Sequence, residues 1–166
     1  MNKEREDEMV DIIKPVRHGI LIGLLGIIFG IVWAFWLALG QEIIVNKLAA
    51  SMTQDVVQKE EVIKVSIKRL GMGHSHSMGL GLVAIAVSFI LAFTTAPNKL
   101  KAAGSLLSGL GGIVFPLAWI IMGCKTPALG IDGAHAAVTP LAGIGVILIL
   151  SGLFIAVGCL IKDALK

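Results

Sequence analysis

Charged residues are scarce in this sequence of 166 residues. Asp, Glu, Lys and Arg together make up 15% of the chain, and hydrophobic residues make up 56%. Ordinary globular proteins contain about 25% charged and roughly 45–50% apolar residues, so a soluble enzyme is excluded. The net charge of +3 is small and scattered along the chain, which excludes a phosphate-binding footprint for nucleic acid. The composition indicates an integral membrane protein.

Four long segments contain no charged residue at all. They lie between Arg17 and Glu42, Arg69 and Lys99, Lys101 and Lys125, and Asp132 and Lys162. A helix needs ~20 apolar residues to cross a hydrocarbon core of ~30 Å, and each segment is long enough. Only helices and closed barrels satisfy their backbone in a bilayer, and no barrel-like alternation is present. We therefore expect an all-α membrane protein with four transmembrane helices, at 18–40, 78–96, 103–123 and 136–161.

The lysines and arginines favour a cytoplasmic location for both termini. An even number of spans places the termini on one side, and eight of the 14 basic residues fall there. They are Lys3, Arg5, Lys14, Arg17, Lys99, Lys101, Lys162 and Lys166. We expect the first span to remain as an anchor in the plasma or cytoplasmic membrane, because it is longer than a signal-peptide core.

Two segments are expected outside the bilayer. Residues 1–17 form an N-terminal segment, acidic at first and then basic, with a short helix that stops at Pro15. In residues 41–73, apolar residues such as Val56 and Ile63 recur at helical spacing, which predicts one amphipathic helix. We expect Gly71 and Gly73 to end this helix.

Several kinds of active site are missing from the sequence. There is no Walker motif, no HExxH motif and no Ser/His/Asp or paired-carboxylate constellation, so hydrolase and kinase functions lack a site. No charged residue lies inside a predicted span, which argues against an ion-coupled transporter or proton pump. On its own, the chain is not expected to be an enzyme.

One segment nevertheless contains side chains that could bind a metal or a cofactor. Met72, His74, His76 and Met78 alternate with small residues immediately before the second span. In an extended backbone the four side chains would lie on one side of the chain. In a helix, His74 and His76 would diverge by about 200°, so the backbone conformation decides what the segment binds.

The predicted topology adds a third histidine to the same membrane face. His135 lies at the start of the fourth span, and Cys124 precedes it in the short connecting loop. One hypothesis is a haem b held by His76 and His135 between facing helices, with His74 or Arg69 at a propionate. Gly79 and Gly81 lack side chains and would let the flat macrocycle approach the helix backbone. The alternative is a copper or other metal site made from Met72, His74, His76, Met78, His135 and Cys124.

A purely structural interpretation stands beside these two. Ser75 or Ser77 could cap the second span, and the histidines would then be boundary residues. Small residues at four-residue spacing, such as Gly19/Gly23 and Gly26/Gly30, favour close helix packing. The hypotheses are therefore a haem- or copper-binding subunit serving electron transfer in a larger membrane complex, and a non-catalytic accessory subunit. The expected partners are the lipid bilayer and other membrane subunits or further copies of this chain.

Overall fold

A computed structural model describes residues 9–52 and 59–166, and within these parts the chain forms helices joined by short turns, with no strand. The helices are α2 (Arg17–Leu39), α3 (Gln41–Ala50), α4 (Lys59–Ala92) and α5 (Asn98–Ala164), and residues 9–13 form a short helical stretch before α2. Among these residues, α2, α4 and α5 are long and apolar enough to cross a membrane. This supports the expectation of an all-α membrane protein.

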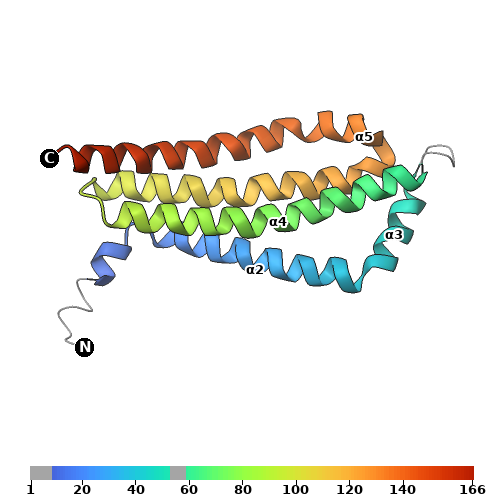
Figure 1. The fold of residues 1–166 in the computed structure, drawn as a ribbon, viewed down its shortest axis with the longest axis horizontal. Coiled ribbons are helices and arrows are strands. Elements are labelled where there is room, and N and C mark those ends of the chain that lie inside the picture. Colours follow the sequence, from blue (N-terminus) through green and yellow to red (C-terminus); the bar gives the residue numbers. More distant parts are fainter. Residues whose placement is uncertain (1–8, 53–58) are drawn as a thin grey trace.

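Helix α5 is interrupted once, at Gly130. This residue has φ 75° and ψ 174°, a conformation that is essentially restricted to glycine. The arms 98–129 and 131–164 therefore fold back on each other, and α2, α4 and both arms lie side by side (Figure 1). The loop expected between 123 and 136 is replaced by helix on both sides of this single residue.

Helix α4 is continuous from Lys59 to Ala92, through the whole histidine and methionine segment. The expected helix end at Gly71 and Gly73 is wrong, and neither Ser75 nor Ser77 caps a helix there. A single amphipathic helix over 41–73 is not confirmed, because α3 is only 10 residues long and residues from Lys59 onward belong to α4. Val56 and residues 1–8 lie outside the described residues.

Small residues bring the helices together. The buried residues of α2 are its four glycines, Gly19, Gly23, Gly26 and Gly30. Packing of backbone against backbone is how membrane helices gain contact where apolar burial offers no advantage over lipid. The glycine spacings predicted from the sequence are thus used within the chain.

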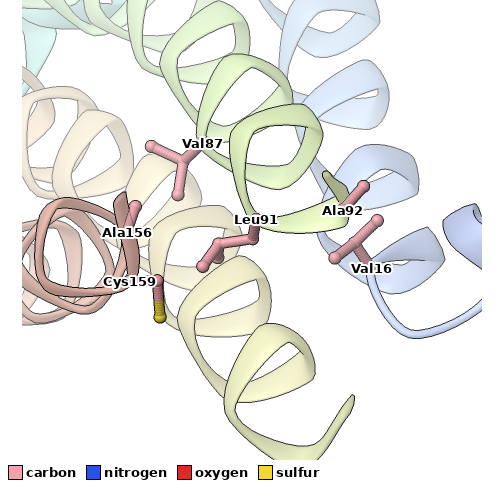
Figure 2. Close-up of a cluster of buried hydrophobic side chains, with 6 residues drawn as sticks. All are labelled: Val16, Val87, Leu91, Ala92, Ala156 and Cys159. Carbon is pink, nitrogen blue, oxygen red and sulfur yellow. The ribbon is translucent and has the colours of Figure 1, made fainter. Parts of the chain in front are cut away.

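Larger side chains fill the ends of the bundle. Figure 2 shows the cluster at the Lys99 end, where Val16 precedes α2, Leu91 lies near the end of α4, and Cys159 belongs to the second arm of α5. At the opposite end, Ile44 and Leu48 of α3 pack against Leu70 of α4. Helix α3 therefore closes the bundle near the Gly130 turn.

Candidate functional site

The face of α4 that meets α2 carries a ladder of polar contacts. Trp33 Nε1 donates to the Leu70 carbonyl at 3.1 Å, and Ser77 Oγ donates to the Gly26 carbonyl at 2.6 Å. Between them, His74 Nδ1 lies 2.8 Å from the Gly30 carbonyl oxygen. Each contact joins one turn of α4 to one turn of the antiparallel α2.

The Gly30 contact fixes the tautomer of His74. A carbonyl oxygen only accepts, so Nδ1 must carry the proton, and in the neutral ring the free lone pair is then at Nε2. The side chain is half-buried. His74 thus acts as a hydrogen-bonded element of the helix interface, with one nitrogen left unused by that contact.

His76 faces a different neighbour. Its ring lies 5.1 Å from the Phe115 ring in an edge-on arrangement and 5.6 Å from the Trp119 ring, measured between centroids. Phe115 and Trp119 belong to the first arm of α5. Such ring pairs are favourable contacts in themselves, so His76 takes part in aromatic packing between α4 and α5.

The alternating set therefore separates into two pairs. Met78 lies one turn after His74 and also faces α2, because its Cγ is 2.8 Å from the position that a Cβ on Gly30 would occupy. Met72 lies one turn before His76 and shares its side of the helix by spacing. The extended conformation that would have aligned all four side chains does not occur.

His135 lies at a different depth from His76. The second arm of α5 passes Phe115 at Gly145, because a Cβ added to Gly145 would lie 2.8 Å from the backbone nitrogen of Phe115. His135 is ten residues closer to the Gly130 turn, which is about 15 Å along a helix. It is exposed, and so is Cys124 on the first arm. The structure does not bring His76 and His135 to one level of the bundle.

Two of the residues expected around a haem, Gly81 and Arg69, have other roles in the structure. A Cβ on Gly81 would lie 2.7 Å from the Gly23 carbonyl oxygen, so α2 occupies the space that a macrocycle would need there. Arg69 donates to Thr126 Oγ1 at 2.7 Å and to the Ile131 carbonyl at 3.1 Å. It therefore holds the Gly130 turn.

The usual ligands among the described residues do not assemble a metal centre. Among residues 9–52 and 59–166, no group of three or more His, Cys, Asp or Glu side chains lies close enough to hold a metal ion. The methionines do not complete such a set, because Met78 and His74 face α2 whereas His76 faces α5. The six residues considered for copper are thus distributed over separate surfaces.

The structural roles of two residues were not predicted from the sequence. Arg69 is buried and links α4 to the turn of α5, and Trp33 donates a hydrogen bond across the α2–α4 interface. Arg69 is the last charged residue before the second charge-free segment, which is the one sequence signal for its position. Nothing in the sequence indicated the partner of Trp33.

Comparison with known proteins adds no assignment, because no family model, curated protein or solved structure matches the chain.

Proposed function

We propose that the chain is an integral membrane protein with four spans and with both termini in the cytoplasm. The spans are α2, the apolar part of α4, and the two arms of α5. Helix α4 has 34 residues, about 51 Å at 1.5 Å per residue, so its first turns extend beyond a core of ~30 Å. Helix α3 lies at the outer boundary as an amphipathic element, with Ile44 and Leu48 turned toward the bundle.

Its function is that of a non-catalytic structural or accessory subunit in a membrane complex. One observation carries this proposal: His74, His76 and Arg69 of α4 are each engaged by a neighbouring helix rather than converging on one site. His74 bonds to α2, His76 packs against α5, and Arg69 holds the α5 turn. Such contacts hold neighbouring helices together, and these three side chains do not form one set of ligands.

The outward faces are the surfaces available to lipid or to other subunits. Large apolar side chains are exposed along α2, including Phe35 and Trp36, and along the second arm of α5, including Ile147 and Phe154. In a bilayer these apolar side chains would contact lipid acyl chains and would need no protein partner. A partner subunit, or another copy of the chain, would replace lipid on part of this surface.

The test is purification of the full chain from its native membrane in a mild detergent, after cross-linking. An accessory subunit is expected to be recovered with defined membrane partners and with no chromophore. Recovery of the chain alone, or only with abundant unrelated proteins, would contradict this role.

A second candidate function is binding of haem b, or alternatively of copper, for electron transfer. It is favoured by the geometry of His74, since metal-bound histidines commonly donate their other ring N–H to a carbonyl or carboxylate. Oxidised and dithionite-reduced absorption spectra, with elemental analysis of the same sample, decide between the candidates. Sharp reduced bands with about one iron per chain would replace the accessory role with that of a cytochrome.

Membrane topology requires a separate measurement. In a chain carrying Cys124→Ala and Cys159→Ala, single cysteines at Lys99 and Asp132 probe the two ends of the bundle. An impermeant maleimide applied to intact cells is expected to label the Asp132→Cys chain and to leave the Lys99→Cys chain unlabelled. The reverse pattern would invert the proposed orientation.

A further inference from the structure

Two open grooves lie side by side at the end of the bundle that contains Lys99. One, of about 640 Å³, is called the polar groove because its lining includes the polar side chains of Lys14, Arg17, His18, Asn98 and Lys99. The other, of about 610 Å³, is lined by apolar residues and by the same Lys14 and Arg17. The two grooves therefore meet at two cationic side chains.

The cations of the polar groove are available to a ligand. Lys14, Arg17 and Lys99 are exposed, and among the described residues the only ion pair joins Lys166 and Asp163. Arg17 Nε donates to His18 Nε2 at 3.3 Å, which leaves the terminal nitrogens of the guanidinium unused. Among the described residues that line the groove, Asp11 is the one carboxylate, so the cations outnumber it there.

A neighbouring lysine, Lys101, differs from these cations because the fold uses its ammonium group in a hydrogen bond. Lys101 is buried, and its Nζ donates to the Ala92 carbonyl at 2.9 Å, where it caps the last turn of α4. Lys99 lies two residues earlier and makes no such contact. The groove thus contains cations that the fold itself does not use.

The apolar groove begins at the same two cations. It is lined by Met9, Val10 and Ile13, and the side chains of Met9 and Val10 are 53% and 63% exposed. The grooves lie where α2 begins at Arg17 and α5 begins at Asn98, the level at which the proposed spans enter the headgroup region. A charged and an apolar surface that meet at this level match the two halves of a phospholipid.

We propose that these grooves bind an anionic phospholipid. The lipid phosphate would be held by Lys14, Arg17 and Lys99, and one acyl chain would lie along Met9, Val10 and Ile13. Basic pockets between helices on the cytoplasmic side favour anionic headgroups, and the proposed orientation places this site there. The inference rests on the proposed membrane insertion, and it adds a lipid-specific site to it.

The test is native mass spectrometry of the detergent-purified full chain with equal amounts of phosphatidylglycerol and phosphatidylcholine of identical acyl chains. The chain is expected to retain phosphatidylglycerol preferentially. Lys14→Gln, Arg17→Gln and Lys99→Gln should each lower this preference about fivefold, the effect of one cation at an anionic surface.

Matched controls lie at the other end of the same bundle. Lys64→Gln and Lys68→Gln also remove exposed cations, but from α4 near the Gly130 turn, and should leave the preference unchanged. Equal binding of the two lipids, or an equal loss in the controls, would overturn the proposal. Because the altered side chains are exposed, unchanged circular dichroism is expected for all five variants.

A free phosphate ion shares the headgroup chemistry but leaves the apolar groove empty. Inorganic phosphate in excess should therefore not displace phosphatidylglycerol, and Val10→Ser should weaken lipid retention. Displacement by phosphate together with no effect of Val10→Ser would overturn the lipid assignment. These outcomes are independent of the cross-linking and maleimide results, so failure here is distinguishable from failure of the proposed function.

Discussion

Gly23 of α2 and Gly81 of α4 lie against each other's backbone. A Cβ added to either glycine would lie 2.7 Å from the carbonyl oxygen of the other. Real Cβ atoms do not approach this closely, so the helix separation here depends on the absence of both side chains. The neighbouring contacts of Ser77 and His74 with α2 are short because the two backbones are held together at this point.

Gly23→Ala is expected to destabilise the bundle, whereas Gly26→Ala is not. The new methyl group at residue 23 meets backbone that can yield only by moving α2 away from α4, at a cost of about 1–3 kcal/mol. At residue 26 the nearest atom would be 3.6 Å away, which is ordinary contact. Unfolding in mixed dodecylmaltoside and SDS micelles, followed by tryptophan fluorescence, measures the difference.

Equal stability of the two alanine variants would contradict the close approach of α2 and α4. Because both substitutions change glycine to alanine within the same helix, their intrinsic effects on helix propensity cancel in the comparison. The difference between them therefore reports packing alone.

The helical architecture could be predicted from the sequence because the bilayer imposes it. Long charge-free segments must be helical to satisfy their backbone, and this alone located α2 and both arms of α5. The end of the predicted helix at Gly73 was wrong for a related reason. A Cβ there would overlap with Ile120 Cγ1, so Gly73 serves packing in mid-helix rather than termination.

The candidate site was less predictable, because it depended on the direction in which individual side chains point. His74, His76 and His135 were assigned to one membrane face by topology. Depth along each helix and rotation about it were not available from one sequence. The contacts with Gly30 and Phe115 show that His74 and His76 point to different helices.

The two buried serines of the first α5 arm should respond oppositely to alanine. Ser108 Oγ is buried with no hydrogen-bond partner, so Ser108→Ala removes an unsatisfied group and should stabilise the bundle by about 1 kcal/mol. Ser105 Oγ lies 2.7 Å from Ser88 Oγ and donates to the Val16 carbonyl at 3.0 Å. Ser105→Ala should therefore destabilise it by about 1–2 kcal/mol.

The same mixed-micelle unfolding ranks the serine variants against the unaltered chain. Both substitutions remove one hydroxyl from one helix, so each serves as the control for the other. A loss of stability for Ser108→Ala as large as that for Ser105→Ala would show that Ser108 has a partner.

Gly130→Ala should weaken the reversal between the α5 arms. Its φ of 75° with ψ of 174° is unfavourable for any residue with a Cβ, at a cost of about 1–3 kcal/mol. Gly143→Ala is the control, because nothing lies within 4 Å of its Cβ position and its backbone is helical. Thermal melting of the detergent-purified variants should show a lower Tm for Gly130→Ala only, and a matching decrease for Gly143→Ala would refute this account.

The two histidines of α4 should differ in what they contribute. His74→Leu removes the donor to the Gly30 carbonyl and should cost about 0.6–1.5 kcal/mol, whereas His74→Gln keeps a donor and should recover part of it. His76→Phe preserves the ring packing against Phe115 and Trp119, so its cost should be below about 0.5 kcal/mol.

Absorption spectra of the same histidine variants distinguish haem binding from helix packing. If the chain binds haem through His76, the His76→Phe variant loses its reduced bands while its unfolding in mixed micelles is almost unchanged. If the histidines serve only helix packing, stability alone responds, and it responds at His74. A variant series in which stability falls at His76 and not at His74 would contradict both accounts, because the Gly30 hydrogen bond would then contribute nothing to the bundle.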